Sequence, residues 1–173
     1  GKYSPSTNKE IFPIQLKSKS NITIIGSGTE STIIDAENSN RVMFFHSVDN
    51  IIIKDLIIRG GYLNSYGINN DGGGLKLTNS NITLENISIS ENNAWIGGAI
   101  SLKNSIINFN ENITLKNNRG LKEGAAIAFF SHSKINGDYI SKNNKVGIFD
   151  SYNYRQNEIA LVTKVKGKVN YKK

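Results

Sequence analysis

The sequence predicts an all-β protein, a right-handed, single-stranded parallel β-helix of about five coils, and three observations lead to this prediction. First, two asparagines, a spacer, one or two glycines and an apolar pair recur, as ENNAWIGGAI (91–100), KNNRGLKEGAAI (116–127), KNNKVGIF (142–149) and, more loosely, INNDGGGL (68–75). Second, apolar and polar residues alternate between these phrases, as they do in strands. Third, equivalent isoleucines recur 29, 31, 25 and 28 residues apart, at Ile22, Ile51, Ile82, Ile107 and Ile135.

Each coil of 25–31 residues has room for three short strands. We predict strands at 75–77, 82–84 and 87–89 in one coil, and at 100–102, 106–109 and 113–115 in the next coil. Strands at matching positions in successive coils pair with one another, so a β-helix has three faces and one apolar interior. We therefore expect the five equivalent isoleucines to point inward and to stack as one ladder.

The recurring asparagines and glycines predict how the chain turns between faces. Asparagine tolerates the left-handed backbone conformation, and its side chain satisfies backbone groups at a bend. Stacked asparagine side chains also form hydrogen-bonded ladders. Glycine permits a positive φ or a close approach of two backbones before the next strand. ENIS (85–88) and ENIT (111–114) predict a second stacked bend, and we expect Asp55 and Asp138 near that same corner.

Composition excludes several classes of protein. The 173 residues correspond to one domain, and the absence of cysteine rules out disulfides and thiolate metal sites. No apolar run approaches the roughly 20 residues that span a bilayer, so we predict no membrane span in this segment. The net charge is +7, but residues 164–173 alone hold five lysines and no acid. The remainder has 16 basic and 14 acidic residues, so we predict no nucleic-acid binding.

The ends of the chain have different predicted roles. We expect residues 1–163 to form the β-helix and residues 164–173 a basic C-terminal capping strand or tail, whose lysines oppose the addition of further strands. The N-terminal coil edge is predicted to contact a neighbouring domain or another subunit. On this interpretation the sequence is a single domain from a longer protein.

Two stretches resemble known β-helix families. GGAI (97–100), GAAI (124–127) and the preceding ISEN and LKNN resemble the repeats of polymorphic outer-membrane proteins, with Ile or Leu where those repeats have Phe. GKYSPSTNKEIFPIQLKSKSNITIIGSG (1–28) resembles the start of β-helix domains of the pectate-lyase-like superfamily. The resemblance covers most of the chain and implies the fold more directly than the function. Many such relatives are secreted or surface-displayed adhesins and polysaccharide-active proteins, so it implies an extracellular or cell-surface location.

The sequence predicts no catalytic, metal or cofactor site. The acids stand apart in the sequence, and the motifs that the resemblance would imply for hydrolases and lyases are absent. His46 and His132 lie three coils apart in the isoleucine alignment. A β-helix nevertheless brings residues one coil apart together, so Asp55, Glu85 and Glu111 form a possible acidic edge. A polysaccharide lyase or glycoside hydrolase, which needs clustered or paired carboxylates, therefore remains the alternative function.

Aromatic residues in the longer loops provide the predicted binding surface. Exposed rings stack on sugars because the apolar ring face meets the C–H groups of the sugar. The candidates are Tyr62, Tyr66, Trp95, Tyr152 and Tyr154, although these rings could instead cover the coil edges. The first expectation is thus a secreted or cell-surface structural or adhesive module that is not an enzyme. Its predicted partner is a polysaccharide or a host or cell-surface protein.

Overall fold

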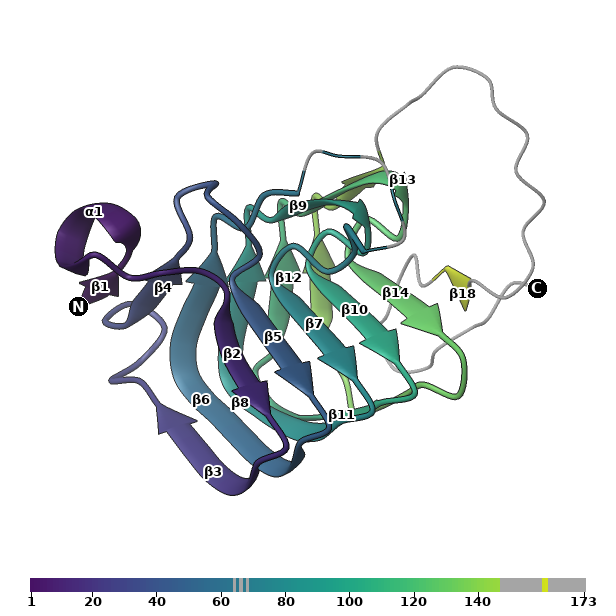
Figure 1. The fold of residues 1–173 in the computed structure, drawn as a ribbon, viewed down its shortest axis with the longest axis horizontal. Helices are drawn as coiled ribbons and strands as arrows, with labels where there is room; N and C mark the ends of the chain where they lie inside the picture. The colour runs from purple at the N-terminus through teal and green to yellow at the C-terminus, as the bar shows by residue number, and fades with distance from the viewer. Residues whose placement is uncertain (64, 66, 68, 147–159, 162–173) are drawn as a thin grey trace.

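A computed structural model describes residues 1–63, 65, 67, 69–146 and 160–161, and it confirms the predicted fold class. The chain forms a parallel β-helix of about five coils, in which strands of successive coils lie side by side (Figure 1). The only helix in the described ranges is α1 (Pro5–Asn8), at the N-terminal end of the solenoid. Ser4 caps this helix, because its hydroxyl accepts from the backbone N–H of Thr7.

Three sheets run along the solenoid. The first sheet contains β2 (Ile14–Lys17), β5 (Met43–His46), β7 (Leu75–Thr78), β10 (Ile100–Lys103), β14 (Ile127–Phe130) and the antiparallel β18 (Ala160–Leu161). The second contains β1 (Lys2–Tyr3), β3 (Ser20–Ile25), β4 (Ile33–Asp35), β6 (Asp49–Arg59), β8 (Asn81–Ser90), β11 (Ile106–Glu111), β12 (Thr114–Lys116), β15 (Lys134–Asn136) and β16 (Ile140–Lys142). The third contains β9 (Asn93–Ile96), β13 (Arg119–Glu123) and β17 (Lys145–Val146).

The predicted isoleucine ladder is confirmed. In strand register, Ile22 pairs with Ile51, Ile51 with Ile82, Ile82 with Ile107, and Ile107 with Ile135. The last four are buried, and Ile22 in the first coil is half-buried. Each strand contributes further inward side chains two residues apart, and together they fill one continuous core.

Left-handed residues mark the corners of the coils in columns. One column, between the first and second faces, holds Ser18, Ser47, Asn79, Asn104 and Ser131, with φ between 48° and 56°. A second, within the second sheet, holds Asp55, Asn86 and Asn112. A third, before the third sheet, holds Gly60, Glu91, Asn117 and Asn143. Asparagine is the most frequent residue in these columns, because it occupies the left-handed region at a lower cost than most other residues do.

One asparagine of each Asn-Asn pair, the first in 92–93 and the second in 117–118 and 143–144, forms a ladder inside the third corner. The backbone N–H of Asn92 donates to Oδ1 of Asn118 at 3.1 Å, and the N–H of Asn118 donates to Oδ1 of Asn144 at 2.9 Å. The side-chain N–H groups of Asn118 and Asn144 donate to the carbonyls of Ile89 and Leu115, both at 2.9 Å. Asn92 and Asn118 are each 1% exposed, so these amides replace the water that the corner excludes.

A serine ladder performs the same task at the first corner. The backbone N–H of Ser80 donates to Oγ of Ser105 at 3.1 Å, and that of Ser105 donates to Oγ of Ser133 at 3.2 Å. Each hydroxyl in turn donates to a carbonyl of its own coil, that of Thr78, Lys103 or Phe130. Both corners therefore bind one coil to the next through side chains as well as strand pairing.

The glycine pair that follows the third sheet has two different roles. Gly97 has a φ of 64°, and so occupies the left-handed conformation. Gly98 lies between coils, where a Cβ atom would come within 2.5 Å of the Arg119 carbonyl oxygen. The repeated Gly-Gly thus turns the chain and then lets two backbones approach closely.

The structure divides the middle coils differently from the prediction: 82–84 and 87–89 belong to one strand, β8, and a further strand follows the third corner. The segments 93–96 and 119–123, which sequence analysis assigned to turns, are the strands β9 and β13. Beyond the parallel coils, β18 pairs with β14 in the antiparallel direction. The predicted capping segment 164–173 lies outside the described residues, so its role stays a prediction.

The inward ladder gives a direct test of the core. We expect Ile107→Ala to lower the free energy of unfolding by about 2–5 kcal/mol, because Ile107 is fully buried between Ile82 and Ile135. Ile106→Ala is the matched control, since this neighbour on the same strand is 40% exposed. Urea unfolding of both variants measures the difference. Equal losses of stability would contradict the assignment of Ile107 to the core.

Candidate functional site

The outward side chains of the third sheet and of the loop before it form a row along the solenoid, called here the outer row: Tyr62, Asn93, Arg119 and Lys145. Tyr62 pairs with Asn93, Asn93 with Arg119, and Arg119 with Lys145, each from the neighbouring coil. Tyr62 is 37% exposed, Asn93 is half-buried, and the two cations are exposed. An aromatic ring, an amide and two cations thus follow one another at the strand spacing of about 4.8 Å.

Of the five predicted aromatic binding residues, the structure places two on this side of the solenoid: Tyr62, in the outer row, and Trp95, on the same strand as Asn93. Trp95 is half-buried and follows Asn93 on the same side of β9, because Ala94 and Ile96 are the buried residues of that strand. The backbone N–H of Trp95 donates to the Asn70 carbonyl at 2.8 Å, which fixes the strand against the loop of the preceding coil. Tyr66, Tyr152 and Tyr154 lie outside the described residues.

The predicted acidic edge comes together only in part. Glu85 and Glu111 are register partners on β8 and β11, beside an irregularity in the pairing, and Glu85 also opposes Lys54. Asp55 lies one position further along, at the left-handed bend, where its Oδ1 accepts from the side chain of Asn86 at 2.8 Å. Oε1 of Glu85 accepts from Asn110 at 2.9 Å. One carboxylate oxygen of Asp55 and one of Glu85 therefore accept hydrogen bonds from asparagine side chains.

Asp35 and Glu37 form a clamp on the N-terminal segment that sequence analysis did not find. Lys2 Nζ lies 2.6 Å from Glu37 Oε1 and 3.3 Å from Asp35 Oδ2, and Arg59 Nε donates to the same Asp35 oxygen at 2.9 Å. Hydrogen bonds from Lys2, and then from Ser6 and Ser4, lower the pKa of Glu37 from its ordinary value of 4.5 to about 2. A general acid needs a raised pKa, so this carboxylate is unsuited to that role.

Asp71 is the centre of a buried charge cluster on the outer side of the first sheet. It accepts from Lys76 Nζ at 2.5 Å and from the hydroxyl of Ser101, and Arg41 lies 3.9 Å away. The Arg41 guanidinium also donates to the carbonyls of Asn69, Asp71 and Gly72, and it stacks over Phe44. These bonds tie the loop before β7 to the sheet. The described contacts of the cluster join parts of the fold to one another, and no pattern in the sequence indicated it.

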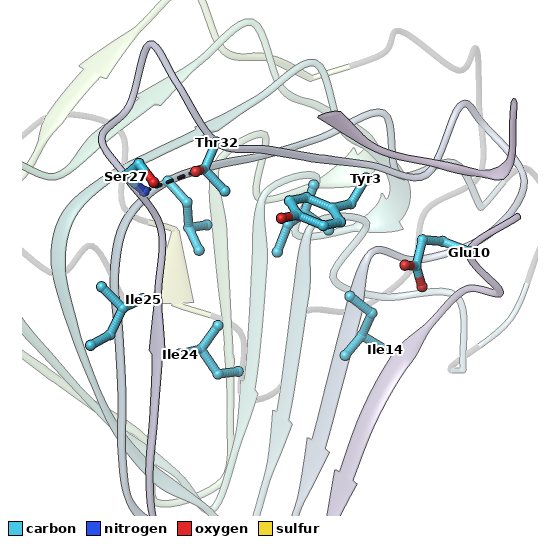
Figure 2. Close-up of a pocket in the computed structure, with 9 residues that line it drawn as sticks. Tyr3, Glu10, Ile14, Ile24, Ile25, Ser27 and Thr32 are labelled. Carbon is cyan, nitrogen blue, oxygen red and sulfur yellow. Dashed lines mark hydrogen bonds between the residues drawn. The ribbon is translucent and has the colours of Figure 1, made fainter. Parts of the chain in front are cut away.

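A pocket of about 250 Å³ opens at the N-terminal coil (Figure 2). Its floor consists of the inward residues Ile14, Ile24, Ile34 and Leu56, and Tyr3 and Glu10 stand at its rim. The strands β2 and β3 each pair on one side only in the described residues, so the pocket is the open end of the apolar core. That this edge contacts a neighbouring domain or subunit stays a prediction.

Among the described residues, no three of His, Cys, Asp and Glu are grouped so as to hold a metal ion. In the same part of the chain, no helix has the length and apolarity needed to cross a membrane. Comparison with family models, with curated proteins and with solved structures finds no match. The resemblance to pectate-lyase-like domains and outer-membrane repeats therefore stays a prediction, and the parallel β-helix is what the structure establishes.

The N-terminal clamp has a predictable response to acid. Because the pKa of Glu37 is lower in the folded state, its contribution to stability is present above about pH 4.5 and is lost as the pH falls towards about 2. The backbone N–H of Ser6 donates to Glu37 Oε2 at 3.0 Å and reports on the clamp. We expect its hydrogen exchange, corrected for the intrinsic pH dependence, to accelerate across this range. Glu37→Gln should abolish the transition and Glu30→Gln should leave it unchanged; an identical transition in Glu37→Gln would refute the assignment.

Proposed function

We propose that this chain is a non-catalytic structural or adhesive module, secreted or displayed at a cell surface, which binds polysaccharide through its third sheet. The observation that carries the proposal is the outer row. It presents a tyrosine ring, a half-buried asparagine whose Oδ1 is enclosed, and two cations along one line of a rigid solenoid. Sugar rings stack on tyrosine, and hydroxyl or acidic groups of the polymer bond to amides and cations.

The rigidity of the scaffold supports this function. Adhesive and polysaccharide-binding surfaces gain affinity when their groups are already in place, because less conformational entropy is lost on binding. Each residue of the outer row belongs to a strand or bridge whose coil is fixed by the asparagine ladder beneath it. Residues one coil apart therefore keep a constant spacing, which suits a ligand that itself repeats.

The state of the carboxylates argues against the alternative enzyme. A retaining or inverting glycosidase needs two carboxylates on either side of a bond, one of them with a raised pKa. Asp35, Glu37 and Asp71 are engaged by cations, and Asp55 and Glu85 by asparagines. Glu85 and Glu111 are register partners on adjacent coils, and Lys54 opposes Glu85 from the coil before it.

The proposal predicts binding to a polysaccharide without cleavage. The purified chain is applied to an array of neutral and acidic polysaccharides, including pectin, alginate, xylan and sulfated chains, and both retention and release of reducing or unsaturated ends are measured. We expect retention on at least one polymer and no release. Tyr62→Ala should weaken binding by roughly threefold to tenfold, the scale of one aromatic contact.

Tyr3→Ala is the matched control, because Tyr3 is 45% exposed but lies at the N-terminal end, away from the outer row. It should bind as the unchanged protein does. Cleavage of a polymer that Glu111→Ala or Asp55→Ala abolishes would replace the proposal with the enzyme alternative. A chain that is retained on no polysaccharide would refute it.

A further inference from the structure

Four exposed cations meet at the third corner of the last two described coils. Lys116 and Lys142 end the strands β12 and β16 and are register partners. Arg119 and Lys145 begin the strands β13 and β17 and are also register partners. We call these four residues the basic corner. All four side chains are exposed, and two residues, the left-handed one and the asparagine of the ladder, separate the cations of each coil.

The basic corner has no carboxylate partner among the residues that the structure describes. The described ion pairs of the chain involve other cations, and Arg59, which precedes the corner in an earlier coil, is paired with Asp35. Glu91 lies at the equivalent bend one coil before Asn117 and forms none of these pairs. The two rows place like-charged residues directly opposite each other on strands about 4.8 Å apart, an arrangement that destabilises a sheet.

We propose that the basic corner binds a sulfated polysaccharide, an inference that rests on the proposed function and names its ligand. Like charges held in register become favourable when an anion lies between them. Arg119 offers a planar fork of donors that suits a sulfate oxygen pair, and the three lysines supply compact charges. The ladder residues Asn118 and Asn144 fix the backbone positions next to the cations, so binding orders only the side chains of the basic corner.

The charge density of the corner selects the sulfated class among polysaccharides. Each coil presents two cations, one from each row, and the rise of one coil is close to the length of one hexose unit. A ligand that follows the solenoid axis therefore needs about two anionic groups per sugar to satisfy both rows. A uronate polymer with one carboxylate per sugar supplies half of this charge, whereas multiply sulfated sugars supply all of it.

The outer row favours a sugar polymer over duplex DNA. Arg119 and Lys145 belong to both the basic corner and the outer row, and the outer row continues through Asn93 to the ring of Tyr62. A polymer that leaves the corner along this row meets an amide and an aromatic face, which suit hydroxyls and a sugar ring. Duplex DNA would use the four cations only, because its bases are stacked inside the helix.

The test compares two charge-matched double variants. A heparin decasaccharide, the same decasaccharide after chemical desulfation, and a DNA duplex of equal total charge are titrated by fluorescence anisotropy at several salt concentrations. Lys116→Gln with Lys142→Gln removes one row of the basic corner. Lys103→Gln with Lys134→Gln removes the same charge from exposed positions on other faces of the neighbouring coils.

We expect the unchanged protein to bind the sulfated decasaccharide with a strong salt dependence and to bind the desulfated form and the duplex much more weakly. The corner variant should lose at least about tenfold in affinity, the scale of two charge-assisted contacts, and the control variant less than about twofold. Equal losses in the two variants, or equal affinity for the duplex, would overturn the proposal. Unchanged binding of the desulfated sugar would refute the sulfate requirement while leaving the proposed function intact. A failure of both decasaccharides to bind would refute this inference, whereas the polysaccharide array decides the proposed function.

The melting temperature of the ligand-free protein provides an independent test of the basic corner. If Lys116 and Lys142 serve ligand binding and do not stabilise the fold, replacing them by glutamine relieves the repulsion between them. The corner variant should then melt at a higher temperature than the unchanged protein in low salt. Added salt should narrow this difference. A corner variant that melts at a lower temperature in low salt would show that the cations stabilise the coil and would contradict the inference.

Discussion

The buried asparagine ladder of the third corner is the interaction on which the rest of the structure depends. A β-helix must turn its chain several times in every coil, and each turn leaves backbone groups that strand pairing cannot satisfy. Asn92, Asn118 and Asn144 supply the missing partners, one coil at a time, through both ends of the side-chain amide. Their fixed spacing brings the isoleucines into one ladder and the outer row into one line.

The same corner links the fold to its proposed role. The ladder lies at the bend between two consecutive strands of each coil. The residue before the bend and the residue after it therefore project from adjacent faces, and their separation is the same in each coil. Because the strands pair in register, the side chains at these positions form rows along the solenoid axis. In the early coils the position before the bend holds Arg59, which is paired with Asp35, and Ser90, and the position after it holds Tyr62 and Asn93. In the last described coils the same positions hold the four cations of the basic corner. A repeating fold thus becomes a surface suited to a repeating ligand.

Sequence reasoning predicted what depends on the repeat and missed what depends on single contacts. The isoleucine spacing and the Asn-Asn phrase determined the core ladder and the turn chemistry, because every coil repeats them. The strands β9 and β13 were missed because their few residues lie between turn-forming asparagines and glycines. The Glu37 clamp and the Asp71 cluster join residues about 30 positions apart with no repeated pattern. The basic corner needed the strand register, which brings Lys116 beside Lys142.

Amide hydrogen exchange of the ladder asparagines, followed by NMR, tests the central claim most directly. The account predicts that the backbone N–H groups of Asn92 and Asn118 exchange as slowly as those of the core strands, although both residues stand next to a bend. It also predicts that Asn118→Ala selectively removes the protection of Asn92, whose N–H donates to the Asn118 side chain. Rapid exchange of both amides in an otherwise protected protein would contradict the claim that this ladder holds the coils together.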